Sequence, residues 1–229
     1  MIDHTHDLAS VHAATERLLR AVAALDNAAV TQPSRLPGWT RGHVLAHIAR
    51  NADALVNALE GRPMYVSGAT READIERDAP RPLDVQLADL RETAARFQRV
   101  GAAPADWSRT VELRNGVTDR AERLPFRRWV EVELHHVDLG IGYEPEDLPE
   151  DFTEREIRFL RARFDGHQDV PTTRLTTSDG RTWTTGGGAP GGPVEVEGPA
   201  ADLLGWLSGR RGGSGLTVKL GTLPTLPPL

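Results

Sequence analysis

The chain has no cysteine among its 229 residues. This absence excludes a disulfide scaffold, a cysteine nucleophile and every zinc site that uses thiolate ligands. A metal would have to be held by histidine and carboxylate side chains. The sequence also lacks an apolar run of the roughly 18 residues that a membrane helix needs, and it begins with His and Asp where a signal peptide would be basic and then apolar. We therefore expect a cytoplasmic protein with no membrane partner.

Lysine is almost absent, because Lys219 is the only lysine among the 27 basic residues and the others are arginines. Asp and Glu total 33, which gives a formal net charge of −6. This charge balance argues against a broad surface for nucleic acid, although it is compatible with a local anion site built from arginine. We therefore expect no nucleic-acid partner.

Helical periodicity dominates the first two thirds of the chain. Apolar residues recur every three or four positions in four segments, residues 5–27, 40–61, 83–101 and 125–140. This is the pattern of helices with one buried face. Because each such helix must bury its apolar stripe against another helix, the four segments predict a helical bundle.

Two shorter features lie between these segments. Thr40 is a suitable N-cap for the second long helix, and Thr70 is a candidate cap for a short helix over residues 71–77. The Asn115-Gly116 pair is typical of a hairpin turn, but a plain loop that leads to the next helix explains it equally well. The sequence leaves both readings open.

The composition changes after Asp165, where glycine, threonine and valine replace the helix-forming residues. Strand patterns occur at residues 172–177, 181–185, 194–197 and 216–220, and a helix that begins after Pro199 interrupts them. Residues 150–164 have helical spacing, whereas residues 186–193 are so rich in Gly and Pro that we expect a flexible loop. We predict a helical bundle at residues 1–148 and a small α+β domain at residues 149–229.

Two of the expected long helices carry histidine in a spacing that suits a metal site. His43 and His47 are four residues apart, and so are Glu131 and His135, which places each pair on one helix surface. Helical bundles hold metals with carboxylates and imidazoles that project inward from facing helices. The same spacing is also common in surface helices, where it forms only a weak side-chain pair.

The fourth long segment contains a second candidate pair, Glu133 and His136. On a helical projection Glu131 and His135 lie opposite the apolar stripe, while Glu133 and His136 lie near it. Because a helix in a two-domain protein is able to bury both faces, the projection does not choose between the two pairs.

The most distinctive segments are Leu-Pro-Gly-Trp-Thr-Arg-Gly-His-Val-Leu-Ala-His-Ile at residues 36–48 and Glu-Val-Glu-Leu-His-His-Val-Asp-Leu-Gly at residues 131–140. They resemble the mycothiol-dependent maleylpyruvate isomerases, which belong to the larger DinB-like group of metal-binding helical bundles. Residues 71–76 and 198–210 resemble further stretches of the same family, so the likeness extends over both parts of the chain. Its motifs indicate the family more strongly than the substrate, because many actinobacterial relatives share them.

The resemblance implies a DinB-like four-helix bundle followed by a small, sterol-carrier-like α+β domain. It also implies that His47, Glu131 and His135 bind zinc or another divalent metal. By the same likeness Arg71 and Arg210 match arginines that hold the substrate. The other polar residues of these motifs are then expected to support the metal ligands or to be structural: His43, His136 and Asp138.

The reaction implied by the resemblance is the conversion of maleylpyruvate to fumarylpyruvate, with the low-molecular-weight thiol mycothiol as cofactor. A thiolate activated by the metal would add to the cis double bond, and elimination after rotation would release the trans product. Arg71 and Arg210 would clamp the two carboxylates of the substrate. The lack of cysteine is compatible with a nucleophile that comes from outside the chain.

Two alternatives remain open from the sequence. An enzyme of the same architecture could transfer mycothiol or a related thiol to another electrophile, since the selectivity of a pocket is not readable from one sequence. A non-catalytic, metal-stabilised binding protein is the other alternative. It would have a closed metal shell and no thiol-dependent turnover.

Overall fold

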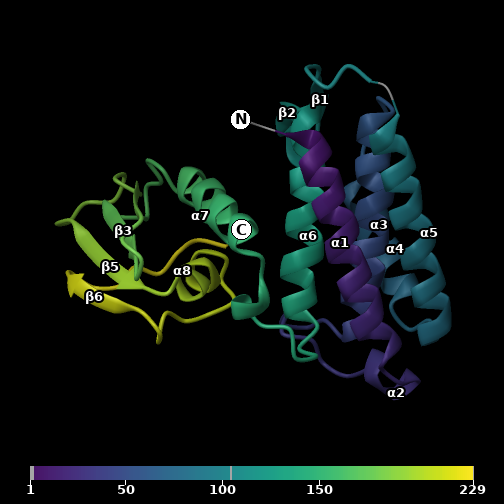
Figure 1. The fold of residues 1–229 in the computed structure, drawn as a ribbon, viewed down its shortest axis with the longest axis horizontal. Helices are drawn as coiled ribbons and strands as arrows, with labels where there is room; N and C mark the ends of the chain where they lie inside the picture. Colours follow the sequence, from purple (N-terminus) through teal and green to yellow (C-terminus); the bar gives the residue numbers. More distant parts are fainter. Residues whose placement is uncertain (1–2, 104, 229) are drawn as a thin grey trace. The chain divides into compact units, whose positions relative to one another are not determined.

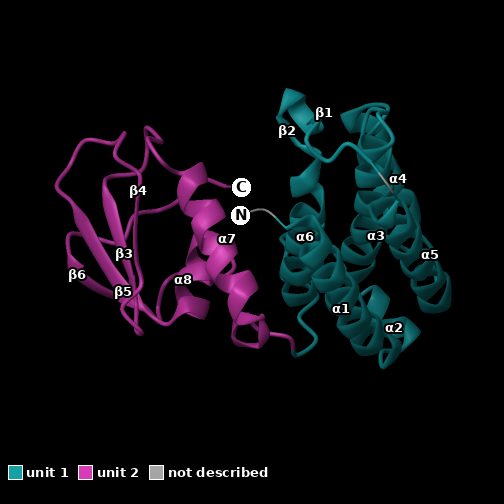
Figure 2. Cartoon of the chain, turned by 45° about the horizontal axis from the view of Figure 1, so that its top comes forward, with its two compact units in different colours: residues 1–142 teal, residues 143–229 magenta. Residues whose placement is uncertain are grey.

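The computed structural model describes residues 3–103 and 105–228 (Figure 1). The chain divides into two compact units, Met1–Gly142 and Tyr143–Leu229 (Figure 2). Within the described ranges, none of the helices is both long and apolar enough to span a lipid bilayer. The candidate metal ligands all belong to the first unit.

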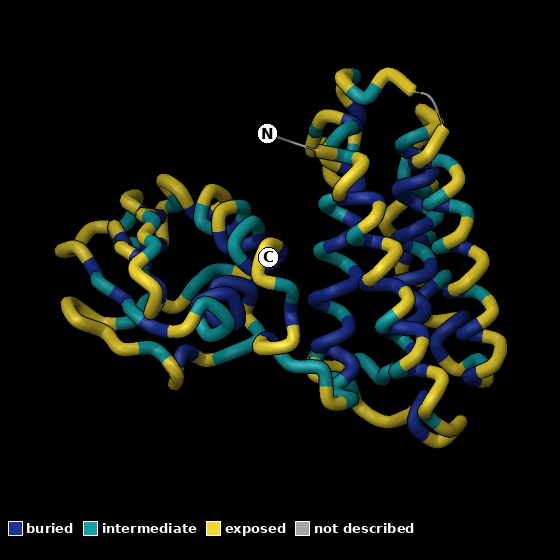
Figure 3. The backbone as a smooth tube through the Cα atoms, in the orientation of Figure 1, coloured by how far each residue is buried: buried dark blue, intermediate teal, exposed yellow. Residues whose placement is uncertain are grey.

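The first unit is a bundle of four long helices. These are α1 (His4–Ala23), α3 (Arg41–Leu59), α5 (Leu83–Ala102) and α6 (Leu124–Asp138), and two shorter helices, α2 (Asn27–Val30) and α4 (Gly68–Asp78), flank α3 in the chain. Helix α3 packs against α4, α5 and α6, and α1 packs against α5 and α6. The buried stripes of the helices meet in one core, as Figure 3 shows, so the predicted bundle is confirmed.

Side-chain caps set the beginnings of α3 and α4. Thr40 caps α3 as predicted: its Oγ1 accepts from the backbone N of His43 at 3.4 Å, and His43 Nδ1 accepts from the backbone N of Thr40 at 3.1 Å. The predicted cap of α4 is wrong. Ser67, not Thr70, caps this helix, because Ser67 Oγ accepts from the backbone N of Thr70 at 3.0 Å, and α4 therefore begins at Gly68.

Gly42 allows the start of α3 to approach the end of α4 closely. A Cβ atom at this position would lie 2.1 Å from the carbonyl oxygen of Ala79 and 2.8 Å from Cγ1 of Val30. Gln86 Nε2 donates to the carbonyl oxygens of both Gly42 and Ala79, at 3.3 and 3.0 Å, and so fixes the contact. The packing at this point requires glycine.

We expect Gly42→Ala to lower the free energy of unfolding by about 3 kcal/mol, because the backbone has to shift to admit the methyl group. Urea unfolding followed by circular dichroism measures the change. Gly212→Ala is the control, since a Cβ atom there meets no heavy atom within 4 Å. Equal unfolding midpoints for the two variants would contradict this account of Gly42.

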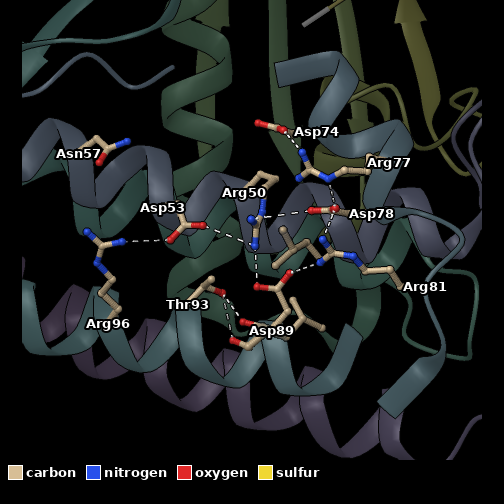
Figure 4. Close-up of polar contacts among 12 residues, drawn as sticks. Arg50, Asp53, Asn57, Asp74, Arg77, Asp78, Arg81, Asp89, Thr93 and Arg96 are labelled. Atoms are coloured by element: carbon tan, nitrogen blue, oxygen red, sulfur yellow. Dashed lines mark hydrogen bonds and ion pairs between the residues drawn. The ribbon is translucent and has the colours of Figure 1, made fainter. Parts of the chain in front are cut away.

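A network of ion pairs joins α3, α4 and α5 (Figure 4). Asp78, 1% exposed at the end of α4, accepts from Arg77 Nε at 2.8 Å and also pairs with Arg81. Arg50 of α3 lies between two carboxylates. Its Nη1 is 3.8 Å from Oδ2 of Asp78, and its Nη2 is 2.5 Å from Oδ1 of Asp89 on α5. Because the central carboxylate is buried, removal of its arginine partners would leave an uncompensated charge between α4 and α3, which costs more than the loss of an exposed pair.

A small hairpin connects α5 to α6. Strands β1 (Thr110–Glu112) and β2 (Thr118–Arg120) pair antiparallel, with Val111 opposite Asp119. Between them η1 (Arg114–Gly116) contains Asn115 and Gly116 with positive φ angles of 61° and 72°. A second short turn, η2 (Ala121–Arg123), leads into α6. Of the two readings left open by the sequence, the hairpin is correct, with a connection longer than two residues.

The second unit is a four-stranded sheet with helices packed on it. The strands β3 (Thr173–Thr177), β4 (Thr182–Thr185), β5 (Val194–Gly198) and β6 (Thr217–Leu220) have the order β4-β3-β5-β6, in which β3 and β5 are parallel and the other pairs antiparallel. Helices α7 (Glu150–Arg163) and α8 (Ala200–Leu207) pack on each other and on the sheet, after the short η3 (Pro145–Asp147). The predicted α+β architecture is confirmed.

Candidate metal centre

His47, Glu131 and His135 converge between α3 and α6. Nε2 of His47 lies 3.0 Å, and Nε2 of His135 3.2 Å, from Oε2 of Glu131. One ligand atom from each residue lies within 4.8 Å of the other two. In residues 3–103 and 105–228 this is the one group of three or more His, Cys, Asp or Glu side chains close enough to share an ion. The structure therefore brings together the three residues that the resemblance selected.

The donor set of this triad fits a zinc ion. Zinc binds imidazole nitrogen and carboxylate oxygen at about 2.0–2.2 Å, so the ligand atoms of a tetrahedral site lie about 3.3 Å apart. The separations of 3.0 and 3.2 Å at Glu131 are close to this value. Two imidazoles and one carboxylate also leave a fourth position for water or an exogenous ligand, as in catalytic zinc sites.

The alternative pair on α6 faces a different neighbour. Glu133 is fully buried, and its Oε1 accepts from Arg17 of α1 at 2.5 Å and from the indole nitrogen of Trp129 at 3.0 Å. Helix α6 packs against α1 with this side and against α3 with the side that carries Glu131 and His135. Both faces of the helix pack against a neighbouring helix, which explains why the helical projection did not choose between the pairs.

Asp138 orients the imidazole of His135. Its Oδ2 lies 2.8 Å from His135 Nδ1, and the residue is 1% exposed. Burial by itself lowers the pKa of His135, but the hydrogen bonds with Asp138 and Glu131 outweigh it, so the pKa lies above its ordinary value. A carboxylate behind a histidine ligand fixes the ring and strengthens the opposite nitrogen as a ligand.

The other two members of the triad have lowered pKa values. Burial lowers the pKa of His47, and the nearby charges of His135 and Arg71 act in the same direction against the hydrogen bond with Glu131. Burial raises the pKa of Glu131, but the hydrogen bonds with His135 and His47 overcome this and hold it well below its ordinary value. Near neutral pH Glu131 is thus a carboxylate and His47 a neutral imidazole, and of the two histidines His135 holds its proton more tightly, so a metal competes with a proton mainly at His135.

Helix α4 places Arg71 beside the triad. The residue is 9% exposed, and its Nη2 lies 3.1 Å from Nδ1 of His47. Its Nη1 donates to Glu72 at 2.6 Å, and its guanidinium carbon lies 5.9 Å from the ring centre of Tyr65. A buried guanidinium in this position is able to bind an anion close to the triad.

The remaining predicted residues have other surroundings. Arg210 follows α8 in the second unit, where its Nη1 donates to the carbonyl oxygen of Ser208 at 2.8 Å. His43 uses Nδ1 in the cap of α3, and its Nε2 lies 3.4 Å from Glu76. His136 is buried on α6. None of these three belongs to the group of side chains that meets at Glu131.

Arg128 is a residue near the triad that the sequence analysis missed. It is 1% exposed on α6, and its Nη1 donates at 2.8 Å to the carbonyl oxygen of Ile48 and to Oδ1 of Asn51, both on α3. Burial lowers the pKa of Arg128 to about 10, so the group stays a cation at neutral pH. This buried charge ties α6 to α3 one turn from Glu131. No sequence signal pointed to this role, because arginine is common throughout the chain.

Two family models match the chain. The model described as "Mycothiol maleylpyruvate isomerase N-terminal domain" matches residues 11–140, and the one described as "MDMPI C-terminal domain" matches residues 147–228. Among solved structures, the chain is similar to a mycothiol-dependent maleylpyruvate isomerase, with 27% identity and a TM-score of 0.90 over 99% of this chain and 97% of that one. A variant of that enzyme with one histidine replaced by alanine matches over the same shares, with 26% identity and a TM-score of 0.90. A comparison with curated proteins gave no match.

Proposed function

Because the chain belongs to the mycothiol maleylpyruvate isomerase family, we propose that it is a zinc- and mycothiol-dependent enzyme that isomerises maleylpyruvate to fumarylpyruvate. The observation that carries this proposal is the convergence of His47, Glu131 and His135 inside the part of the chain that matches the family's N-terminal domain. The similar solved structures are of a mycothiol-dependent maleylpyruvate isomerase, which supports the choice of thiol and substrate.

The triad would hold the metal through Nε2 of His47, Nε2 of His135 and a carboxylate oxygen of Glu131. Zinc in this site would supply positive charge that stabilises a thiolate at neutral pH, where a free thiol with a pKa of about 8.5 is mostly protonated. Since the three ligands contribute one negative charge, that of Glu131, a divalent ion retains a net positive charge. Asp138 keeps His135 in the orientation that the ligand set needs.

Arg71, whose Nη2 lies 3.1 Å from Nδ1 of His47, would bind a carboxylate of the substrate next to the triad. Mycothiol would supply a thiolate that forms a carbon–sulfur bond at the cis double bond and leaves again after rotation about the resulting single bond, so that the trans product and the free thiolate would be obtained. During the addition, negative charge would develop on the conjugated carbonyl group of the substrate. A buried guanidinium stabilises this negatively charged group more than the neutral ketone from which it forms. Arg210 would hold the second carboxylate of the substrate.

Assays of the zinc-loaded protein with maleylpyruvate, with and without mycothiol, test the proposal. We expect fumarylpyruvate to form at a measurable rate only when mycothiol is present, with the thiol recovered unchanged. Accumulation of a stable mycothiol conjugate would indicate a transferase instead. No turnover with any thiol, together with a metal that does not exchange its ligands, would indicate a binding protein.

Arg210→Ala is expected to raise the KM for maleylpyruvate about tenfold, because one charge-assisted contact with a carboxylate is lost. Zinc content and the unfolding midpoint should stay the same. Arg174→Ala, which removes an exposed arginine of β3, serves as the control. Unchanged steady-state kinetics in the Arg210 variant would remove Arg210 from the substrate site.

Zinc affinity is expected to rise with pH until His135 loses its proton. The raised pKa of His135 means that below this pKa one proton has to leave before Nε2 binds the metal, so affinity should increase about tenfold per pH unit and then level off. Asp138→Asn removes a hydrogen bond that holds the proton and should shift the plateau to lower pH. Competition with a chromophoric chelator measures both curves. A flat dependence between about pH 6 and 9 would exclude this coupling.

A further inference from the structure

The first unit contains a cavity between the loop after α3 and the β1–β2 hairpin. Its volume is about 550 Å³, and residues 61–65, 67–68 and 109–116 line it together with Ala58. Pockets for drug-sized ligands usually measure about 300–1,000 Å³. The cavity is therefore large enough for a ligand much bigger than a small dicarboxylate.

Tyr65 joins this cavity to the metal triad. Its side chain is part of the lining, and its ring centre lies 5.9 Å from the guanidinium carbon of Arg71. Arg71 Nη2 in turn lies 3.1 Å from Nδ1 of His47. Two side chains in succession thus lie between the cavity and His47, so the cavity is close to the triad.

The three arginines of the lining are largely engaged with the protein. Arg62 pairs with Glu60, and Arg109 donates to the last carbonyl groups of α3. Arg114 has a looser contact, 3.9 Å from Glu72, and its side chain is 50% exposed. The carboxylates of Glu60 beside Arg62, Glu72 near Arg114 and Glu112 in the lining itself offset most of the charge of the three arginines, so the cavity offers hydrogen-bonding groups more than a net positive field. Such a lining suits a neutral polar ligand better than a second anion.

The rest of the lining matches a hydroxyl-rich molecule. Ser67, Thr110 and Asn115 contribute polar side chains, and Met64 and Leu113 contribute apolar ones that are able to cover carbon faces. Mycothiol carries its cysteine on a sugar and inositol body, which is neutral and rich in hydroxyl groups. We propose that this cavity binds the non-reacting body of mycothiol while its sulfur reaches the metal triad. This inference rests on the proposed function, which names mycothiol as the cofactor.

Gly68→Trp tests the proposal by filling the cavity. Gly68 lines it, and a Cβ atom at this position meets no heavy atom within 4 Å and requires no positive φ angle. The control is Ala73→Trp, which adds the same side chain at an exposed position of the same helix outside the lining. Calorimetric titration of the zinc-loaded full chain compares mycothiol with N-acetylcysteine, which has the same reacting group but lacks the sugar body.

We expect the wild type to bind mycothiol about tenfold more tightly than N-acetylcysteine. Gly68→Trp should lose this preference through weaker binding of mycothiol alone, and Ala73→Trp should keep it. Arg114→Gln, at a half-exposed position, is a second cavity variant in case Gly68→Trp does not fold, and it should weaken mycothiol binding about threefold.

An unchanged preference for mycothiol in the cavity variants would overturn the assignment, as would an equal loss of affinity for both thiols or a wild type that shows no preference. These measurements do not need turnover. If the wild type prefers mycothiol in the way described but does not isomerise maleylpyruvate, the proposed function fails and the cavity assignment stands. If it isomerises maleylpyruvate while the cavity variants keep the preference, only the cavity assignment fails.

Discussion

Replacing His47 by alanine is expected to abolish metal binding and thiol-dependent turnover together. The substitution removes one of the three side chains that meet at Glu131 and leaves two protein ligands. Because loss of even an orienting neighbour costs about 10–100-fold in metal affinity, loss of a direct ligand should cost more than about 100-fold. Without a metal to stabilise the thiolate, the rate should fall by about 1,000-fold. Elemental analysis after dialysis and assays with mycothiol measure the two effects.

His43→Ala is the matched control for this substitution. His43 lies one turn earlier on α3 and uses Nδ1 to cap that helix, so its loss should lower stability by about 1 kcal/mol and leave the zinc content unchanged. If instead His47→Ala still contains one zinc ion per chain, His47 is not a ligand and the proposed site is wrong.

The helices were predictable from the sequence because local signals define them. The apolar stripe of α3 and the cap at Thr40 specify that helix with no reference to the rest of the fold. Helix α4 was harder, because both Ser67 and Thr70 are good caps and only the structure shows that Ser67 Oγ accepts from Thr70 N. Helix α2 was missed, since four residues are too few to show periodicity.

The choice of candidate metal ligands depended on information that local patterns do not contain. Glu131 and Glu133 are equivalent candidates in the sequence, and what separates them is the partner across the helix interface. Arg17 of α1 satisfies Glu133, whereas His47 of α3 faces Glu131. The family resemblance selected the three residues that meet in the structure, because it carries this tertiary information implicitly.

The position of Arg71 also depends on tertiary contacts. Helix α4 is a short, mostly polar segment, and its own sequence does not specify where it packs. The buried Asp78 at its end and Arg50 of α3 hold it in place, and the close approach at Gly42 lets the two helices meet. Residues far from the triad thereby determine which guanidinium lies next to His47.

Arg71→Gln is expected to lower kcat/KM for maleylpyruvate about 100- to 1,000-fold without loss of zinc. The argument starts from the contact between Arg71 Nη2 and His47 Nδ1 at 3.1 Å. A neutral histidine that binds a metal through Nε2 carries its proton on Nδ1 and no longer accepts a hydrogen bond there. With the metal site filled, the guanidinium therefore has N–H groups free for a carboxylate, while Glu72 and Tyr65 still position it.

Two further variants separate this role from a structural one. Arg71→Lys keeps the charge but not the planar fork, so it should retain part of the activity and show its main defect in KM. Arg77→Gln changes a more exposed arginine of the same helix, whose partners are Asp74 and Asp78, and should affect stability more than kinetics. If Arg71→Gln binds zinc and turns over maleylpyruvate like the wild type, the buried guanidinium does not contact the substrate, and the anion clamp has to be sought elsewhere in the chain.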